Sequence, residues 1–305
     1  MNAPSVAVCV ATYRRPESLR ALLHALGAQT FGDQPTPRVT VVVVDNDADA
    51  TARAVVTETG LPWEVVYEVE PRKGLATVRN HLVTLAAGAD FVVFIDDDEV
   101  APPTWLATLL AAQHDTDAAV VTGPVAPRYP PDTAAWITRG DFYGNERRGV
   151  AYGAGLHAAA SNNTLVRQDV FGSLGLRFDE RFNRSGGEDS LLFRQVVARG
   201  ERIVWVPAAV VEEAVAPDRV GVRWVLRRGF REGNIVARCE RELRPGAATV
   251  TREAGKSFAR IGVGAAAALV GAARLDPTRA VRGLRRVWVG LGGLSAFSRH
   301  RVEQY

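Results

Sequence analysis

The order of hydrophobic and polar positions in the first hundred residues predicts strands that alternate with helices. Short apolar runs rich in β-branched residues have the length of strands, and the run at 39–44 is apolar throughout, as in a parallel strand buried on both faces. Between these runs, apolar residues recur with helical spacing. This alternation predicts an α/β fold with a doubly wound, mostly parallel sheet. The expected strands are 6–11, 39–44, 63–69 and 91–95, and the expected helices are 17–26, 50–59 and 75–87.

The pattern becomes less regular after Pro102. We expect the stretch 123–152, which is rich in Pro, Gly and aromatic residues, to be loop and edge structure. The chain has no internal repeat and no low-complexity linker before residue 220, so we expect residues 1–220 to form one domain. The later elements expected in this domain are a helix at 105–113, a strand at 119–122, ordered structure at 161–167, a helix at 190–198 and a strand at 203–206.

Residues 221–305 have a different character. An amphipathic segment at 224–243 is followed by two uncharged apolar stretches, 261–273 and 287–298. Both are shorter than the roughly 20 residues that cross a bilayer, so we expect helices that lie on an anionic membrane surface. The arginines that flank them are Arg274, Arg279, Arg282, Arg285, Arg286, Arg299 and Arg301.

The charge distribution supports that division. The formal net charge is +3, but residues 1–218 hold 19 basic and 28 acidic side chains, whereas residues 219–305 hold 18 and 6. A basic tail on an acidic body favours an anionic partner, which is either nucleic acid or a membrane. The segment 224–231 mixes aromatic and basic residues, as in single-strand binding. Its aromatic residues have the helical spacing of core packing, so we predict a membrane surface and no nucleic acid.

Composition and cysteine content limit the class of protein. With 47% apolar and 23% charged residues, the chain does not have the composition of a disordered protein. It contains no run of eighteen uncharged apolar residues, which argues against a polytopic membrane protein. Cys9 and Cys239 are far apart, which argues against a disulfide framework or a zinc site. No secretory signal is recognisable. We therefore expect a cytoplasmic protein, peripheral on the inner face of the cell membrane.

Four consecutive acids, Asp96, Asp97, Asp98 and Glu99, follow the fourth strand. Their mutual repulsion is costly without a cation, and Mg²⁺ or Mn²⁺ held by one or two of them with phosphate oxygens would relieve it. A solvated acidic turn is the plain alternative. The motif also matches the nucleophile of haloacid-dehalogenase-like phosphatases, but that chemistry requires a lysine downstream in the domain, and Lys73 precedes the motif.

Other candidate residues lie where predicted strands end and helices begin. Lys73 and Arg79 flank a helix start that suits phosphate, although Arg79 also fits a solvated helix charge. Asp45 is placed to accept hydrogen bonds from a ribose or a base, or to cap the next helix. Thr12 and Tyr13 line a base pocket or shape the first turn.

Two pairs of acids remain open between a functional and a structural role. Glu188 and Asp189 follow a glycine pair at a helix start, where one acid can be a general base or a helix cap. Glu212 and Glu213 follow a buried strand and either complete a metal or diphosphate site or pair with the arginines that begin at Arg219. The pairing with arginine is the favoured alternative.

The order of these motifs resembles that of the family 2 glycosyltransferases with a GT-A fold, particularly bacterial exopolysaccharide and cell-surface polysaccharide enzymes. The resemblance covers about residues 5 to 235. Each motif is weak alone, but five in sequence are specific. They are Val-Ala-Thr-Tyr-Arg-Arg-Pro at 10–16, Val-Val-Asp-Asn at 43–46, Lys-Gly-Leu-Ala-Thr-Val-Arg-Asn at 73–80, Asp-Asp-Asp at 96–98 and Gly-Gly-Glu-Asp at 186–189.

The resemblance implies an inverting transferase that moves a sugar from a nucleotide diphosphate donor, usually UDP-linked, to an acceptor hydroxyl. The implied metal ligand is Asp98 and the implied general base is Asp189. The acceptor would be lipid-linked or close to the membrane. The residues implied to bind the donor are Thr12, Tyr13, Arg14 and Asp45 at the nucleoside, Lys73 and Arg79 at the diphosphate, and Asp96 and Asp97 beside the ribose and metal.

The sequence departs from relatives at two places. Many relatives carry a His near Glu212, where this sequence has Glu212 and Glu213, so the third contact to the metal stays open. Glu188, Glu212 and Glu213 are possible additional site residues. The Gln-x-x-Arg-Trp signature of processive synthases is absent, which favours one sugar per encounter.

A sugar nucleotidyltransferase would need a glycine-rich phosphate loop with a lysine after the first strand. A catalytically silent nucleotide-sugar-binding scaffold is the other alternative.

Overall fold

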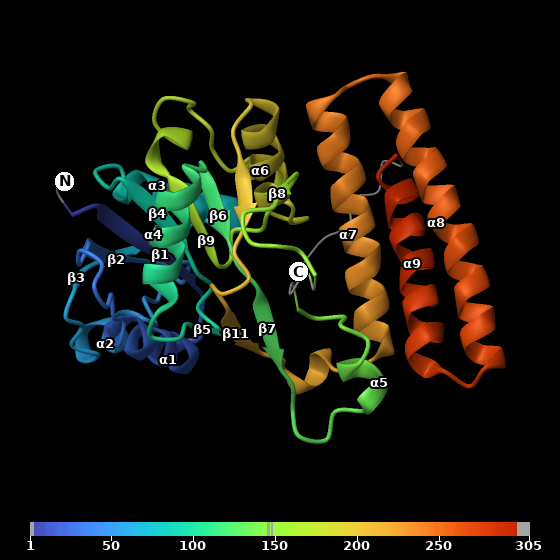
Figure 1. Ribbon diagram of the computed structural model, residues 1–305, viewed down its shortest axis with the longest axis horizontal. Coiled ribbons are helices and arrows are strands. Elements are labelled where there is room, and N and C mark those ends of the chain that lie inside the picture. Colours follow the sequence, from blue (N-terminus) through green and yellow to red (C-terminus); the bar gives the residue numbers. More distant parts are fainter. Residues whose placement is uncertain (1–2, 145–146, 148, 298–305) are drawn as a thin grey trace. The chain divides into compact units, whose positions relative to one another are not determined.

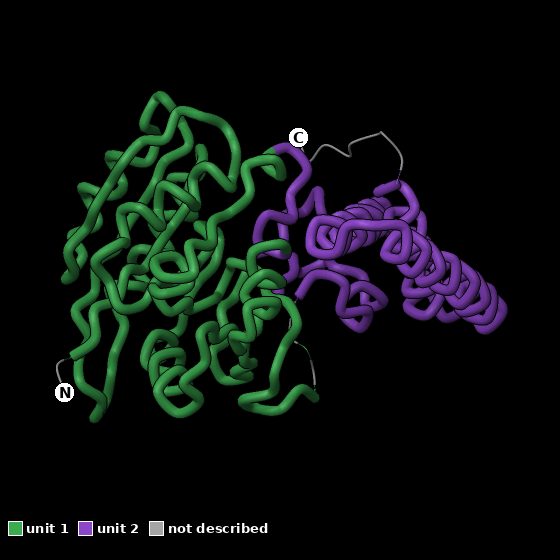
Figure 2. The backbone as a smooth tube through the Cα atoms, turned by 90° about the horizontal axis from the view of Figure 1, so that it is seen from above, with its two compact units in different colours: residues 1–126, 145–183, 191–213 green, residues 127–144, 184–190, 214–305 purple. Residues whose placement is uncertain are grey.

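The computed structural model describes residues 3–144, 147 and 149–297. These residues form two compact units, which Figure 2 colours separately. The first unit takes its described residues from 1–126, 145–183 and 191–213, and the second takes them from 127–144, 184–190 and 214–305. The second unit therefore includes two segments that precede the helical tail. The division at residue 220 expected from the sequence stays a prediction.

The first unit contains a mixed, mostly parallel sheet, with strand order β3-β2-β1-β4-β9-β6-β10-β8 among the described residues. Strands β1, β2, β3 and β4 run parallel, and β9 is antiparallel to its neighbours β4 and β6. The strands are β1 Ser5–Thr12, β2 Arg38–Asp45, β3 Glu64–Val69, β4 Phe91–Phe94, β6 Val120–Thr122, β8 Gly155–Leu156, β9 Thr164–Arg167 and β10 Ile203–Trp205. A small second sheet has the order β5-β11-β7, with β5 Glu99–Val100, β7 Val125–Arg128 and β11 Val211–Ala214.

Helices cover both faces of the large sheet (Figure 1). Alternate residues of β1 point to opposite faces, so Val6 and Val8 join one apolar cluster while Ala7 and Cys9 join the other. Helices α1, α2 and α4 supply the first cluster, and α3 and α6 supply the second. Their bounds are α1 Pro16–Gly27, α2 Arg53–Glu58, α3 Leu75–Leu85, α4 Trp105–Thr116 and α6 Glu188–Ala198, with 3₁₀ turns at Gln168–Val170 and Glu180–Phe182.

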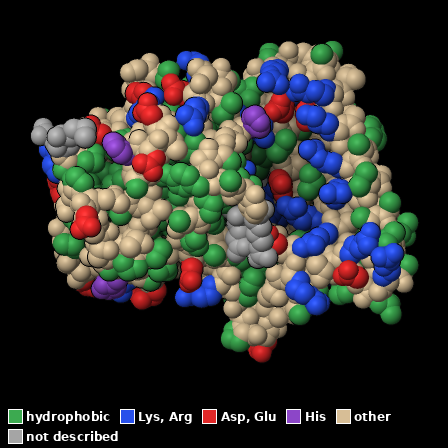
Figure 3. All heavy atoms as spheres, in the orientation of Figure 1, with side chains coloured by type: hydrophobic (Ala, Val, Ile, Leu, Met, Phe, Trp, Pro, Cys, Tyr) green, Lys and Arg blue, Asp and Glu red, His purple; other side chains and the backbone are tan. Residues whose placement is uncertain are grey.

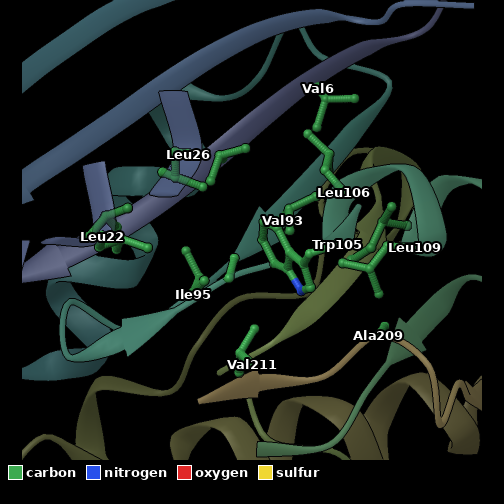
Figure 4. Close-up of a cluster of buried hydrophobic side chains, with 14 of the residues drawn as sticks. Val6, Leu22, Leu26, Val93, Ile95, Trp105, Leu106, Leu109, Ala209 and Val211 are labelled. Carbon is green, nitrogen blue, oxygen red and sulfur yellow. The ribbon is translucent and has the colours of Figure 1, made fainter. Parts of the chain in front are cut away.

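The first of these clusters is drawn in Figure 4. Leu22 of α1 is fully buried against the sheet together with Trp105 of α4. Each buried Leu contributes about 2 kcal/mol from removal of apolar surface from water. The indole N–H of Trp105 donates to Oδ1 of the buried Asn163 at 2.7 Å, so the ring has no unpaired donor in this apolar layer. The cluster packs α1 and α4 against the strands whose ends carry the polar residues.

The four N-terminal strands occur where the sequence predicts them, and so do the helices that connect them. Three details differ. Helix α2 is shorter than predicted, the stretch 123–152 holds the short helix α5 (Ala135–Thr138) besides the expected edge structure in β7, and β9 enters the sheet antiparallel. Antiparallel insertion depends on pairing with strands far away in sequence, which a local hydrophobic pattern does not contain.

The second unit contains three long helices, α7 Val222–Leu243, α8 Ala247–Ala273 and α9 Pro277–Ser295, preceded by a 3₁₀ turn at Pro217–Arg219. Helices α8 and α9 approach closely because glycines face the contact. A Cβ added at Gly283 would lie 2.7 Å from Cα of Ala268, and one added at Gly271 would lie 2.7 Å from Cα of Ala280. No larger side chain fits at these positions without separating the two backbones.

Helix α8 is longer than its uncharged stretch because it begins at Ala247. Among the residues that the structure describes, it is long and apolar enough to cross a membrane by length and composition, with a mean hydropathy of 1.2. The expectation that the tail contains only segments too short to span a bilayer is therefore wrong for the length of this helix. Only 17% of its most apolar window is buried. The positions of Arg299 and Arg301 fall outside the described residues.

The glycine contact makes a direct prediction. Gly283→Val places two methyl groups against the α8 backbone, and we expect it to lower the free energy of unfolding by about 3 kcal/mol. Urea unfolding followed by circular dichroism measures this change. Gly262→Val is the matched control, because an added Cβ at Gly262 meets nothing within 4 Å. Equal stability of the two variants would contradict close packing of α8 on α9.

Candidate active site

The loops that follow β1, β2 and β4 meet at one edge of the large sheet. The register pairs Thr12 with Asp45, and β1 also pairs in parallel with β4, so these strands end side by side. The hydroxyl of Thr12 donates to Oδ2 of Asp97 at 2.8 Å across that edge. The first unit therefore brings together the polar clusters that the sequence places after its strands.

Arg14 joins the loop after β1 to the loop after β2. Its backbone has φ 54°, a left-handed conformation that is uncommon outside glycine. Its guanidinium donates to both carboxylate oxygens of Asp47, at 2.9 and 3.2 Å. This hydrogen bond lowers the pKa of Asp47, which is 2% exposed. The sequence singled out Asp45 in this loop, whereas the structure gives Asp47 the contact to Arg14.

Asp45 lies below the surface with no exposed area. One carboxylate oxygen accepts from the backbone N–H of Asp47 at 3.0 Å, and the other accepts from N–H of Ala52 and from the hydroxyl of Tyr67, both at 2.9 Å. Burial and this hydrogen bond raise the pKa of Tyr67. The geometry is that of the helix-anchoring alternative, because Ala52 directly precedes α2. A nucleoside contact by Asp45 stays a prediction.

Tyr13, Arg14 and Lys73 form a small exposed cluster at this edge. Nζ of Lys73 lies 3.9 Å from the centre of the Tyr13 ring, and the Arg14 guanidinium carbon lies 5.3 Å from it. Lys73 also donates to the backbone oxygen of Asn46 at 2.9 Å. The ring keeps 43% of its surface exposed, so an aromatic side chain and two cations are available together beside β1 and β2.

The start of α3 differs from the phosphate site expected from the sequence. Oδ1 of Asn183 accepts from N–H of Ala76 at 2.9 Å and of Thr77 at 3.3 Å, so these helix N-terminal donors already have a partner. Arg72 is bound by Glu70 through two hydrogen bonds of 3.0 and 2.9 Å. Arg79 is the cation of this segment that faces the acids, with Nη2 3.7 Å from Oδ1 of Asp96.

The acids after β4 form a dense cluster. Glu99 is 1% exposed, and it accepts from the Asn162 amide at 2.9 Å and from the backbone N–H of Asp96 at 3.1 Å. Strand β11 pairs Glu213 directly with Glu99. Because side chains alternate along a strand, Glu212 points the other way and is exposed. Glu213 is therefore the acid of this pair that belongs to the cluster.

The cluster is short of positive charge. Burial, opposed by Arg79 and reinforced by the neighbouring Asp98, Asp97 and Glu213, raises the pKa of Asp96 to about 7. Burial also raises the pKa of Glu99 well above its usual value, with Asp96 adding to the shift. A bound cation would reverse both shifts by stabilising the ionised forms.

Arg15 is the residue of this site that sequence reasoning missed. Its Nη1 atom donates to Oδ2 of Asp98 at 2.7 Å and to Oδ1 of Asp97 at 3.1 Å. It is the residue before Pro16 at the start of α1, where it reads as an ordinary helix-start charge. Its partners become visible only when the loop after β1 is placed beside the loop after β4, and these two loops are far apart in the sequence.

Glu188 and Asp189 belong to the second unit, in the first turn of α6. The glycine pair before them has φ 70° and 98°, which favour glycine, and a Cβ at Gly187 would lie 2.6 Å from Cγ2 of Ile235 on α7. Glu188 is buried, whereas Oδ1 of Asp189 accepts from the N–H of Ser190 at 2.5 Å. Within this unit, α7 thus packs on the turn that carries both acids.

No group of three His, Cys, Asp or Glu side chains in the described chain has the geometry of a complete metal cage. The acid cluster after β4 offers the carboxylate oxygens that Mg²⁺ and Mn²⁺ prefer, and Mg²⁺ commonly binds to one or two carboxylates with phosphate oxygens completing its shell. The donor set therefore fits an ion that arrives with a phosphorylated ligand.

Comparison with known proteins agrees with the fold and the motifs. The family described as glycosyl transferase family 2 matches residues 7–175. The succinoglycan biosynthesis protein ExoM of Rhizobium meliloti is 35% identical over 226 residues, which cover 73% of this chain and 71% of that protein. The glucosyl-dolichyl phosphate glucuronosyltransferase of Haloferax volcanii is 27% identical over 250 residues, which cover 75% and 74%.

Solved structures show the same fold. The mannosyltransferase PcManGT from Pyrobaculum calidifontis, in complex with GDP-Man and Mn²⁺, has a TM-score of 0.66 at 20% identity and covers 98% of this chain and 89% of that one. S. aureus TarS 1–349 in complex with UDP-GlcNAc has a TM-score of 0.55 at 15% identity and covers 95% and 91%. The fold is thus of the GT-A type, which is a fold of glycosyltransferases. The chain belongs to glycosyl transferase family 2, and it resembles exopolysaccharide enzymes.

The burial of Asp45 makes a prediction that separates its two roles. Asp45→Asn leaves a buried N–H without its acceptor, so we expect the free energy of unfolding to fall by about 2 kcal/mol. Urea unfolding without any ligand measures it. Asp49→Asn is the control, because the Asp49 side chain is 77% exposed. Unchanged stability combined with weaker nucleotide binding would instead assign Asp45 to the nucleoside.

Proposed function

We propose that the protein is an inverting, metal-dependent, non-processive glycosyltransferase. It transfers a sugar from a nucleotide diphosphate donor, a UDP-sugar, to a hydroxyl of a lipid-linked or membrane-proximal saccharide. The observation that carries this proposal is the meeting of Thr12, Arg79 and the acid cluster after β4 at one sheet edge. Ligands of doubly wound sheets bind beyond the carboxyl ends of such strands.

The donor site is proposed to use the exposed cluster beside β1 and β2. Tyr13 offers a ring face to the nucleoside, and Arg14 and Lys73 offer positive charge. Arg79 lies at the acids and is proposed to bind the diphosphate. Two relatives of known fold are complexes with UDP-GlcNAc and with GDP-Man, which supports a nucleotide-sugar donor of this kind.

The metal is proposed to be Mg²⁺ or Mn²⁺, held by Asp98. Glu213 is the additional acid closest to this role, because it lies with Asp96 and Glu99 in the charge-deficient cluster. A bound ion of this type neutralises the negative charge that develops on a departing diphosphate. Arg79 acts in the same direction from the protein, because its guanidinium is buried beside Asp96 and is fixed before the reaction.

The general base is proposed to be Asp189. Its carboxylate would accept the proton of the acceptor hydroxyl while that oxygen forms the new bond to the anomeric carbon and the bond to the diphosphate breaks. A single displacement of this kind inverts the anomeric centre. The tight turn Gly186-Gly187, packed by α7, gives Asp189 a defined backbone position at the start of α6.

Variants of the two central acids test the chemistry. We expect Asp189→Asn to lower kcat by about 10²- to 10⁴-fold with little change in donor KM, because the proton acceptor is lost while donor contacts remain. Asp98→Ala should abolish metal-dependent turnover. Release of UDP from a panel of UDP-sugars with saccharide acceptors is the readout. Asp117→Asn, at an 88% exposed side chain, is the control. Wild-type turnover in both site variants would remove these assignments.

The membrane part of the proposal rests on helices α8 and α9. Phe258 and Leu269 of α8 are 63% and 71% exposed, and Leu275 in the turn before α9 is 90% exposed. Exposed Arg274 and Arg279 lie beside that turn. Basic side chains gather over the C-terminal helices in Figure 3. Exposed apolar residues next to arginine fit an interface with anionic lipid on the cytoplasmic face.

Vesicle sedimentation tests the membrane contact. We expect the chain to bind vesicles of phosphatidylglycerol and phosphatidylcholine more tightly than phosphatidylcholine alone. The double variant Arg274→Ala/Arg279→Ala should weaken binding to the anionic vesicles by about 30-fold. Arg38→Ala/Arg199→Ala, which removes two exposed arginines of the first unit, should leave it unchanged. Equal binding to both vesicle types would contradict the electrostatic contact.

Two alternatives make different demands. A sugar nucleotidyltransferase needs a glycine-rich phosphate loop after β1, and the residues in that place are Tyr13, Arg14 and Arg15. A catalytically silent scaffold would bind the nucleotide sugar without turnover across a broad acceptor panel. The acid cluster argues against the scaffold, because a scaffold has no need for carboxylates at elevated pKa.

A further inference from the structure

Arg15 occupies the position between the acids where a metal ion is expected. A single nitrogen, Nη1, lies 2.7 Å from Oδ2 of Asp98 and 3.1 Å from Oδ1 of Asp97. The guanidinium therefore uses carboxylate oxygens that a divalent ion would also use. A metal ion at Asp98 and the Arg15 guanidinium compete for these carboxylates, because each neutralises the same negative charge. Binding of one therefore weakens binding of the other.

The two partners of this bridge differ in freedom. The Asp97 side chain is 7% exposed and is held from β1 by the hydroxyl of Thr12. The Arg15 side chain is 44% exposed. Its backbone is fixed between the left-handed Arg14 and Pro16 at the start of α1. Asp97 is thus held in place, and the Arg15 side chain can rotate into solvent without moving the backbone.

We propose that Arg15 is a built-in counter-ion of the metal site, which bridges Asp97 and Asp98 in the metal-free enzyme and leaves when metal and donor bind together. The inference rests on the proposed metal dependence. The donor diphosphate carries oxygens that bind both the metal and a released guanidinium. Loss of the bridge is therefore compensated only when the donor is present.

This arrangement couples the two ligands. Metal alone has to displace Arg15 from Asp98 without compensation, so its affinity is reduced. With the donor present, Arg15 has another anionic partner and the metal binds more tightly. By linkage, the nucleotide binds more tightly in the presence of metal by the same factor. The enzyme thereby avoids holding a divalent ion tightly at an empty donor site.

The test is binding of Mn²⁺ alone, measured by loss of the free Mn²⁺ signal in electron paramagnetic resonance, with and without UDP. We expect Arg15→Gln to bind Mn²⁺ without UDP about fivefold more tightly than the wild type, the size of a partly exposed ion pair. The increase in Mn²⁺ affinity caused by UDP should shrink correspondingly. A merely structural role of Arg15 would give the opposite result, since a damaged site binds metal more weakly.

Arg20→Gln is the matched control. Arg20 is the next arginine along the chain, on α1, and its partner is Glu58 in place of the metal acids. At about 0.15 M salt its charge is largely screened, so Mn²⁺ affinity without UDP should change by less than about twofold. Arg15→Met serves as a second variant of similar volume should Arg15→Gln fold poorly, with the same expected increase.

The outcomes separate the inference from the proposed function. If wild-type protein binds Mn²⁺ with UDP but the Arg15 variants bind Mn²⁺ alone no more tightly, the counter-ion role is overturned and the metal dependence stands. If Arg20→Gln tightens Mn²⁺ binding as much as Arg15→Gln, the effect is general electrostatics and the bridge has no specific role. If neither the wild type nor any variant binds Mn²⁺ even with UDP, both proposals fail.

Discussion

Repulsion between the carboxylates after β4 is the constraint on which the first unit depends. Five acids, Asp96, Asp97, Asp98, Glu99 and Glu213, lie in one region that the protein partly withdraws from water. The protein offsets this with a hydroxyl from Thr12, an amide from Asn162 and the guanidinium groups of Arg15 and Arg79. These contacts come from separate parts of the chain, so the acids fix which loops must meet.

The parallel strands supply that meeting at little cost. Because β1, β2 and β4 are neighbours in one sheet, their ends lie side by side, and backbone pairing together with buried valines and leucines holds them there. The polar residues are then free to serve chemistry. In the second unit the same separation holds. Glycines pack α8 on α9 through close backbone contacts. Apolar and basic side chains of these helices therefore remain exposed on the outside.

The sequence predicts most of the first unit because its signals are local. The β-branched run before Asp45 and the apolar run before Asp96 each end in acids, and a parallel sheet places such ends together. What the sequence does not predict depends on distant contacts. Asn183 caps α3 from another segment, Asp45 turns inward to Ala52, and Arg15 reaches the acids after β4. Strand β11 alone decides that Glu213, and not Glu212, faces them.

We propose that these acids hold a divalent ion together with the donor diphosphate. The most direct measurement is an anomalous difference map from crystals grown with Mn²⁺ and UDP. We expect one peak in contact with Asp98 and the diphosphate, with Arg15 turned away from Asp97 and Asp98. A bound UDP with no peak at Asp98, or a peak elsewhere with the Arg15 bridge intact, would contradict it.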